Sequence, residues 1–321
     1  MVADIEGDGS TEIVIGGNKA LLWYKPQTFE KGIVGNGAFH VGLIAEDLVK
    51  DGIRHVIAGE QNPQTEKWMI TWYKGPKDVR QSWSRYVIDE DCLAGAHCLA
   101  FADLDGDGEK EIIANATYNP VWGLFAYKKP ASVTQPWEKH TIQTGFSEEG
   151  LAVTDLNGDQ KLDIVSGVAW YEPPTSGTFS GTWTRHVYAP NFREMVRVAL
   201  ADVNADGRTD IVTVESEFPD GLMSWFENRI GQDARNPWLE HPLFSGLNFA
   251  HSFAAYKDQA SNHLRVFVAE MMKGGWNAPY NFDARLLEFT NADRGQSWRQ
   301  ELLYQGAGTH QAVQYDIDGD G

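Results

Sequence analysis

Short apolar runs alternate with acidic, glycine-containing turns along most of this chain. Runs such as 13–15 and 211–214 are rich in Ile and Val, and an acidic turn precedes each of them. Around these turns, apolar and polar positions alternate and do not recur every 3.6 residues, which argues against amphipathic helices. β-Branched residues bounded by Gly, Asn and Asp are typical of short strands joined by tight turns. The pattern therefore predicts an all-β chain.

One acidic hairpin recurs along the sequence. Each copy begins near an aspartate, continues with acidic or amide residues at alternate positions, and ends in an apolar strand. The copies are 3–15 (ADIEGDGSTEIVI), 102–114 (ADLDGDGEKEIIA), 154–166 (TDLNGDQKLDIVS), 201–213 (ADVNADGRTDIVT) and 315–321 (YDIDGDG), with weaker copies at 46–58 and 257–269. The aspartates that anchor them are Asp4, Asp47, Asp103, Asp155, Asp202, Asp258 and Asp316.

The anchors lie 43 to 58 residues apart, a period that fits one four-stranded propeller blade. After each hairpin comes an aromatic strand, such as 22–26, and most units add a strand opened by a tryptophan, such as Trp137. Seven anchors therefore predict a seven-bladed β-propeller that forms a single domain over 1–321. The first unit lacks a strand before its anchor and the last stops at Gly321. Because an open ring exposes strand edges, we expect a fragment, incomplete at both termini, of a longer protein.

The hairpin D-x-[DN]-x-D-G-x-x-[DE] followed by Ile-Val resembles the FG-GAP/VCBS repeat, which is found in integrin α-subunit propellers and many secreted microbial proteins. The resemblance extends over essentially the whole chain. It implies a propeller whose calcium-binding loops join the first and second strands of the blades. The histidines that precede several anchors also resemble those in the propellers of aldos-2-ulose dehydratases and rhamnose–glucuronate lyases, which implies a carbohydrate-active enzyme.

The acidic loops have the composition of calcium sites. Calcium takes six to eight oxygen ligands at about 2.3–2.6 Å, and carboxylates at loop positions one, three, five and nine, with a carbonyl at seven, can surround one ion. The predicted ligands are Asp4, Glu6, Asp8, Glu12, Asp103, Asp105, Asp107, Glu111, Asp155, Asn157, Asp159, Asp163, Asp202, Asn204, Asp206, Asp210, Asp316, Asp318 and Asp320. We expect these ions to staple the hairpins. The loops after Asp47 and Asp258 are degenerate and are expected to lose the ion, which leaves His55 and His263 as ordinary loop residues.

A second candidate site lies on the opposite face of the predicted blades, where first strands begin and second strands end. Histidines there are candidate catalytic residues: His97, His310, His251 and His40. The candidate substrate-binding residues are Glu149, Arg193, Arg197, Asn115, Tyr118, Trp276, Lys273, Glu60, Glu215 and Glu270. The histidines could act as a general base, hold a second divalent metal at the axis, or only fill a central channel.

Two classes of function remain open at this point. In the first, the protein is a lyase or sugar dehydratase acting on a uronate-containing oligosaccharide. A histidine then removes the proton beside the carboxylate, and Arg193, Arg197 or Lys273 meets the negative charge. In the second, the protein is a non-catalytic propeller that binds glycans or proteins, as adhesins and integrin α-subunits do. Aromatic residues such as Trp122 and Trp276 either flank a sugar or pack between blades.

Bulk composition narrows the partners further. The formal net charge is −18, which disfavours a nucleic-acid partner. No apolar run reaches about 18 residues, so no membrane span is predicted. Cys92 and Cys98 either form a small loop disulfide or remain free thiols. Calcium loops of this kind suit locations where calcium is abundant, at about 10⁻⁴–10⁻³ M, and we therefore expect a secreted or periplasmic protein.

Overall fold

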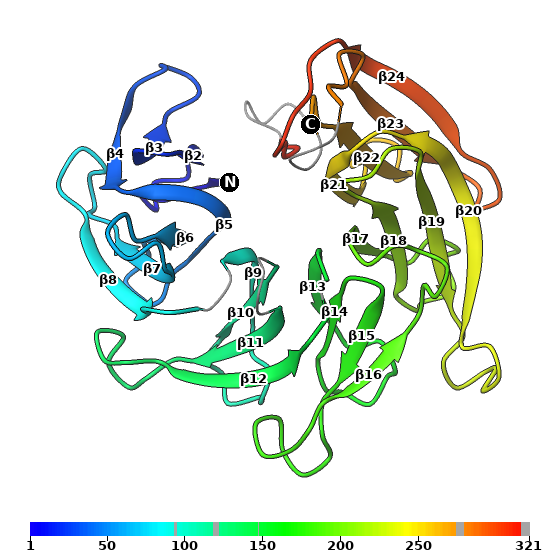
Figure 1. Cartoon of the computed structure of the whole chain (residues 1–321), viewed down its shortest axis with the longest axis horizontal. Helices are drawn as coiled ribbons and strands as arrows, with labels where there is room; N and C mark the ends of the chain where they lie inside the picture. The colour runs from blue at the N-terminus through cyan, green and yellow to red at the C-terminus, as the bar shows by residue number, and fades with distance from the viewer. Residues whose placement is uncertain (93–94, 118–121, 147, 274–278, 316–321) are drawn as a thin grey trace. The chain divides into compact units, whose positions relative to one another are not determined.

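The computed structural model consists of β-strands and their connections (Figure 1). It describes residues 1–92, 95–117, 122–146, 148–273 and 279–315, apart from the side chains of His40 and Val41. The described residues form 24 strands and no helix, which confirms the all-β class. Within these ranges there is accordingly no helix of the length and apolarity needed to cross a membrane.

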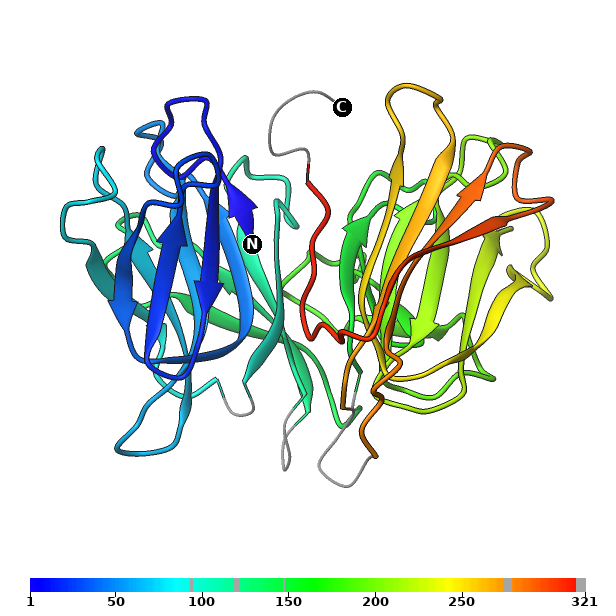
Figure 2. The same cartoon turned by 90° about the horizontal axis from the view of Figure 1, so that it is seen from above.

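The strands form six four-stranded antiparallel sheets, numbered one to six in chain order, and within each sheet neighbouring strands are also consecutive in sequence. Sheets one to three, together with 175–182, belong to the first of two compact units. Their strands are β1 (Val2–Ala3), β2 (Glu12–Gly16), β3 (Ala20–Tyr24), β4 (Lys31–Asn36), β5 (Ala38–Glu46), β6 (His55–Gln61), β7 (Trp68–Lys74), β8 (Ser84–Asp89), β9 (Ala96–Ala102), β10 (Glu111–Ala116), β11 (Gly123–Lys128) and β12 (Glu138–Thr144). The strands of sheet one lie side by side in the turned view (blue in Figure 2).

Sheets four to six belong to the second unit. Their strands are β13 (Leu151–Thr154), β14 (Asp163–Ser166), β15 (Ala169–Glu172), β16 (Thr184–Val187), β17 (Val196–Ala201), β18 (Asp210–Glu215), β19 (Gly221–Asn228), β20 (Trp238–Leu247), β21 (Ala250–Lys257), β22 (Leu264–Glu270), β23 (Arg285–Asn291) and β24 (Arg299–Gln305). Every sheet therefore repeats the four-strand unit that the sequence predicts.

The recurring acidic hairpin coincides with the turn between the first and second strands. Asp103, for example, directly follows β9, and Asp202 directly follows β17. In sheets one to five, the second strand begins eight residues after the anchor, whereas in sheet six Leu264 begins β22 six residues after Asp258. The shorter sixth hairpin agrees with its weaker match to the repeat.

The first sheet is more complete than the sequence indicates. Val2 and Ala3 form β1, which pairs with Ile13 and Glu12 of β2. The expectation that the first unit lacks a strand before its anchor is therefore wrong. The seventh anchor, Asp316, lies outside the described residues. Six sheets are observed, and the seven-bladed propeller stays a prediction.

The second strands form the centre of the core. Every residue of β10 and of β18 is buried, as expected for strands that are covered on both faces. In the first unit, Ile57 and Trp72 of sheet two belong to one apolar cluster with Ile112 and Phe125 of sheet three. A cluster of the same kind joins sheets five and six. Since full burial of one such side chain is worth about 1.5–3 kcal/mol, these clusters hold neighbouring sheets of a unit together.

Both cysteines are free thiols in the structure. Cys92 is buried, and this burial raises the pKa of its thiol to about 12. Cys98 Sγ lies 3.7 Å from Nδ1 of the adjacent His97. Of the two alternatives that the sequence leaves open, the structure therefore has the free thiols.

Candidate functional site

The hairpin loops, numbered like their sheets, share one backbone arrangement. In loops one to five the anchor carboxylate accepts a hydrogen bond from the backbone N–H five residues later. The pairs are Asp4–Gly9 (2.9 Å), Asp47–Gly52 (2.8 Å), Asp103–Gly108 (2.9 Å), Asp155–Gln160 (2.9 Å) and Asp202–Gly207 (3.0 Å). The donor residue has a φ between +69° and +87°, a conformation that favours glycine. The anchor aspartate and this turn residue together fold the loop.

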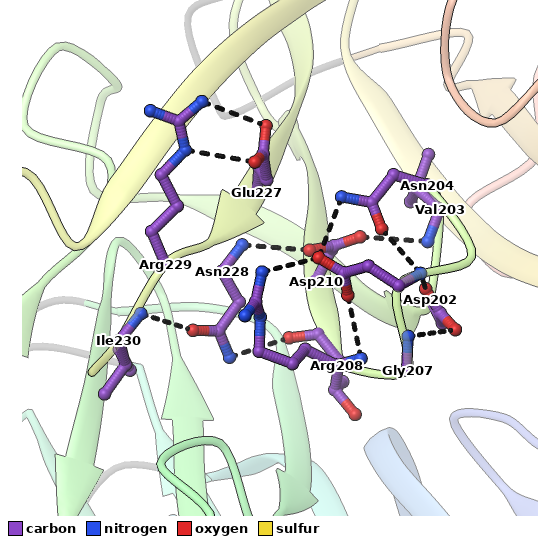
Figure 3. Close-up of polar contacts among 12 residues, drawn as sticks. Asp202, Val203, Asn204, Gly207, Arg208, Asp210, Glu227, Asn228, Arg229 and Ile230 are labelled. Carbon is purple, nitrogen blue, oxygen red and sulfur yellow. Dashed lines mark hydrogen bonds and ion pairs between the residues drawn. The ribbon is translucent and has the colours of Figure 1, made fainter. Parts of the chain in front are cut away.

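Position nine carries a fully buried acid in four loops. Glu12, Glu111, Asp163 and Asp210 are all 0% exposed. In each of them one carboxylate oxygen accepts the N–H of the residue that follows the anchor. The donors are Ile5 (3.0 Å), Leu104 (2.9 Å), Leu156 (2.8 Å) and Val203 (2.9 Å). Figure 3 shows this bond between Asp210 and Val203, together with the bond from Gly207 to Asp202. The position-nine acid therefore closes each loop against its own beginning.

The second oxygen of these carboxylates differs among the loops. Among the described residues, Oε1 of Glu12, Oε1 of Glu111 and Oδ1 of Asp163 are buried and have no hydrogen-bond partner. Asp210 Oδ1 instead accepts the backbone N–H of Asn228 at 2.9 Å (Figure 3). Leaving a buried acceptor unpaired costs about 1–3 kcal/mol, and more when the group is charged. Three loops therefore each contain an oxygen that a cation would satisfy.

Burial also raises the pKa of the position-nine acids. The pKa rises to about 7 for Glu12, Glu111 and Asp163, and to about 6 for Asp210. Desolvation is the largest cause in every case, and nearby loop carboxylates raise the pKa further, whereas the backbone N–H bonds lower it. A divalent cation would supply the positive charge that these desolvated carboxylates lack.

In loops one and three, two further loop carboxylates lie close enough to the position-nine acid to share one ion. Two sets of ligand oxygens lie within 4.8 Å of one another: Glu6–Asp8–Glu12 and Asp103–Asp105–Glu111. Each set offers oxygen atoms only, which suits a hard cation such as Ca²⁺. The ligands predicted in the seventh hairpin, Asp316, Asp318 and Asp320, lie outside the described residues.

Loops two and six have a basic side chain at or beside the positions where the other loops have candidate calcium ligands. Loop two has His55 at position nine. The sequence suggests that His55 is a loop residue, but in the structure it begins β6 and is 0% exposed. Its Nδ1 accepts the backbone N–H of Gly75 at 3.1 Å, so the neutral ring has its proton on Nε2, which lies 3.7 Å from Asp51 Oδ1. In loop six, Arg265 lies 2.9 Å from the anchor Asp258.

A second polar cluster lies in the second unit around His251 of β21, whose side chain is 1% exposed. Its Nδ1 contacts the carbonyl oxygen of His310. Because a carbonyl only accepts, Nδ1 carries the proton and Nε2 has the lone pair. Nε2 contacts the Arg197 guanidinium and lies 3.5 Å from Glu217 Oε1 and 3.9 Å from Glu149 Oε1. The structure thus places the imidazole of His251 between one cation and two acids.

Two residues of this cluster are not predicted from the sequence. The hydroxyl of Ser216 donates to Glu149 Oε2 at 2.6 Å, and the next residue, Glu217, has a φ of +63°. A non-glycine residue in the left-handed region costs of order 1–3 kcal/mol, and such strain is concentrated at functional sites. No sequence motif marks Ser216 or Glu217, because backbone strain is visible only in the structure.

Three acids that the sequence predicts to bind substrate form ion pairs with arginines in the structure. Their exposures are 4% for Glu60, 2% for Glu215 and 1% for Glu270. The ion pairs are Glu60–Arg85, Glu215–Arg193 and Glu270–Arg285. Glu60 also accepts the hydroxyl of Tyr73 at 3.1 Å. These partners explain the buried acids without any ligand, and a role in substrate binding stays a prediction.

The other predicted site residues are distributed over several strands. His97 is half-buried in β9, and Asn115 is buried in β10. His310 is exposed, and Lys273 forms an isolated antiparallel β-bridge with Tyr280 through the backbone. The side chain of His40, and all of Tyr118 and Trp276, lie outside the described residues. Within the second unit, the structure therefore brings four predicted residues together: Glu149, Arg197, His251 and His310.

The comparisons with known proteins agree with the repeat. Residues 155–213 match the model of the FG-GAP-like repeat. No curated protein matches the chain. Among solved structures, it is similar to a lectin from Agrocybe aegerita that recognises non-reducing terminal N-acetylglucosamine. The identity is 13% and the TM-score 0.55, over 94% of this chain and 79% of the lectin chain.

A second similar structure is the V. cholerae biofilm matrix protein Bap1. The identity is 13% and the TM-score 0.45, over 94% of this chain and 58% of that protein, so this chain spans less than two thirds of its length. The likeness to the lectin concerns the fold. Together with the matched repeat, it supports an FG-GAP repeat family.

The burial of Glu270 generates a prediction about stability. Arg285→Met should destabilise the protein by about 3–5 kcal/mol, because it leaves a buried carboxylate without its charged partner. Urea unfolding followed by fluorescence measures the change. Arg299→Met is the control, since the Arg299 side chain is 76% exposed and pairs with Glu301 at the surface. Equal stability of the two variants would show that the Glu270–Arg285 pair is not structural.

Proposed function

We propose that this protein is a calcium-stabilised, carbohydrate-binding protein built from FG-GAP-like repeats. The calcium proposal rests on one observation. In loops one, three and four, the fully buried acid at position nine accepts a backbone N–H with one oxygen, and its other oxygen has no hydrogen-bond partner in the part of the chain that the structure describes. Loops one, three, four and five would hold the ion through the residues at positions one, three, five and nine.

Bound calcium would act as a staple within each hairpin. The anchor follows the first strand and the position-nine acid begins the second strand, so one ion that binds both would fix the connection between them. A ligand that binds only the folded state stabilises it by RT ln(1 + [L]/Kd). Removal of calcium is therefore expected to lower Tm, while the structure of the folded protein outside the hairpins stays the same.

The calcium proposal is tested by Glu111→Gln. The amide keeps an oxygen for the N–H of Leu104 but loses the negative charge, so we expect the affinity of one site to fall at least tenfold, or about 1.4 kcal/mol. Isothermal titration calorimetry on the chelator-treated full chain measures it, and Tm with and without calcium gives the stabilisation. Glu301→Gln, at a side chain that is 53% exposed on β24, is the control. Calcium binding that is absent in the wild type, or unchanged in Glu111→Gln, would contradict the proposal.

The carbohydrate proposal is supported by the likeness to the lectin and by an exposed aromatic pair. Tyr280 and Phe282 are 57% and 70% exposed, and their rings stack with centroids 5.6 Å apart. Lys273 Nζ lies 5.1 Å from the centre of the Tyr280 ring. Aromatic faces suit the apolar faces of sugars, and a nearby ammonium suits a uronate carboxylate. We therefore propose a uronate-containing oligosaccharide as the ligand.

The double variant Tyr280→Ala/Phe282→Ala tests this surface. We expect it to weaken binding of the best uronate-containing oligosaccharide on a glycan array at least tenfold, because both ring faces are lost. Phe29→Ala is the control, since Phe29 is an aromatic residue that is 84% exposed and belongs to the first unit. Equal binding by both variants would exclude this surface, and binding of neutral glycans alone would exclude the uronate.

A second candidate function, elimination from a uronate, is favoured by the tautomer of His251. With its proton on Nδ1, the ring would offer Nε2 as a general base once Arg197, which contacts that nitrogen, moves to the substrate. Arg197, beside Nε2, is placed to stabilise the negative charge that develops when a proton next to a carboxylate is removed. The His251 side chain is only 1% exposed, and for this reason we rank binding ahead of catalysis.

A second divalent metal at this cluster fits less well. Ligand atoms of Glu217, His251 and His310 lie within 4.8 Å of one another. However, the guanidinium of Arg197 contacts the nitrogen of His251 that has the lone pair. A metal ion would have to displace a group of like charge, so no step of the proposed chemistry involves a metal there.

Catalysis is tested with the histidines. If unsaturated product forms from uronate-containing oligosaccharides, His251→Gln should lower its rate of formation at least about 100-fold, the lower end for loss of a general base. His97→Ala and His310→Ala are expected to reduce it as well. His263→Gln, in loop six, is the control. Wild-type binding without product would leave a binding protein, and product formation that is unchanged in His251→Gln would remove His251 from the mechanism.

We also propose a secreted or periplasmic location. It follows from the proposed calcium loops, because extracellular modules bind calcium with dissociation constants of about 10⁻⁴–10⁻³ M. Fractionation of cells that express the native gene would test it.

A further inference from the structure

The end of each third strand lies beside position nine of its loop. In sheets one to five, an aromatic residue of the third strand pairs with the residue that follows position nine. The pairs are Tyr24–Ile13, Tyr73–Val56, Tyr127–Ile112, Tyr171–Ile164 and Phe226–Ile211. The residue after the aromatic is therefore equivalent in all five sheets, and we call it the flanking residue. The flanking residues are Lys25, Lys74, Lys128, Glu172 and Glu227.

In loops one and three, the flanking residue is a lysine that contacts calcium-ligand candidates. Lys25 Nζ pairs with Glu6 at position three. Lys128 Nζ pairs with Asp105 at position three and lies 2.9 Å from Asp107 Oδ2 at position five. An ammonium on these carboxylates neutralises part of the charge that would attract a divalent ion. Calcium that binds in loop one or three must displace the ammonium group of this lysine.

In loops four and five, both positions change together. Position three is an asparagine, and the flanking residue is a glutamate. Glu172 Oε1 accepts a hydrogen bond from Asn157 Nδ2 at 3.3 Å, and its Oε2 lies 2.9 Å from His186 Nε2. In loop five, Glu227 pairs with Arg229 (Figure 3). In loop four, Glu172 thus supplies a negative charge beside Asn157 from the third strand, whereas Glu227 of loop five is paired with Arg229 and His241.

We propose that the flanking residue sets the calcium affinity of its loop and divides the sites into two classes. Lys25 and Lys128 make loops one and three the weaker sites, because they compete with the ion for its ligands. Glu172 makes loop four the tightest site, because it adds a carboxylate beside Asn157. The inference rests on the proposed calcium binding and adds to it the order in which the loops bind calcium.

The other loops fit the same principle. In loop six, which lacks an acid at position nine, Arg265 lies 2.9 Å from the anchor carboxylate. In loop two, Lys74 Nζ lies 3.9 Å from Asp51 Oδ2. Loop five is intermediate, since Arg208 pairs with Asp206 at position five of the loop. Lysine and arginine side chains thus pair with the acids of the loops that are proposed to bind calcium weakly or not at all.

The experiment is a calcium titration of the chelator-treated full chain by isothermal titration calorimetry. The wild type should show two classes of site that differ at least about fivefold in affinity. Lys128→Met should tighten one weak site about fivefold, the order expected for loss of one surface ion pair. Glu172→Gln should weaken one tight site by a similar factor. Lys67→Met is the matched control, because Lys67 pairs with Asp91 at the surface and its loss changes the net charge equally.

A double variant assigns the effect to loop three. In a Glu111→Gln background, where the site of loop three is weakened at least tenfold, Lys128→Met should change the calcium affinity of none of the other sites. Persistence of the effect in this background would show that Lys128 acts through the net charge of the protein, and would overturn the inference.

The outcomes separate the inference from the proposed function. A single class of sites, with affinities unchanged in both Lys128→Met and Glu172→Gln, would overturn the division into two classes and leave calcium binding intact. Failure of the wild type to bind calcium at millimolar concentration would instead overturn the proposed function. Opposite shifts in the two variants, with no shift in Lys67→Met, are the result that we expect.

Discussion

The buried carboxylate at position nine is the contact on which hairpins one, three, four and five depend. It begins the second strand, accepts the N–H that follows the anchor, and so ties the two ends of the loop together. Its second oxygen is the feature that links fold to function, because a desolvated carboxylate is stable only with a donor or a cation beside it. In loop five, Asn228 supplies that donor, whereas in loops one, three and four no donor is found among the described residues.

The buried acids outside the loops provide the contrast. Glu148, for example, is 5% exposed and is bound by the hydroxyl of Tyr171 and the guanidinium of Arg185. Glu60 and Glu270 likewise have arginine partners. The sheets therefore contain acids whose charge the chain itself compensates, while among the described residues no cationic group pairs with the position-nine acids of loops one, three and four. This difference, and not the number of acids, distinguishes the proposed calcium sites from an acidic surface.

The sequence predicts the parts of the structure that local chemistry determines. The spacing of Asp and Gly identifies the hairpins, because the anchor bonds only to residues a few positions away. The two-residue strand β1 was missed, since pairing with β2 and not composition defines it. The partners of Glu60 and Glu270 were missed because Arg85 and Arg285 lie 25 and 15 residues away along the chain. The strained backbone of Glu217 has no sequence signal at all.

The charges of the loops show that the repeats are not interchangeable copies. A lysine beside an acid and a glutamate beside an amide occur at the same two positions, and the first pair has no net charge whereas the second has a net charge of one negative unit. If the acids served only solubility, nothing would couple a residue of the hairpin to a residue at the end of the third strand. The coupling is expected where both residues face a common charge. A divalent cation between the anchor and position nine is the charge that accounts for it most simply, and the same cation would satisfy the unpartnered oxygens of loops one, three and four.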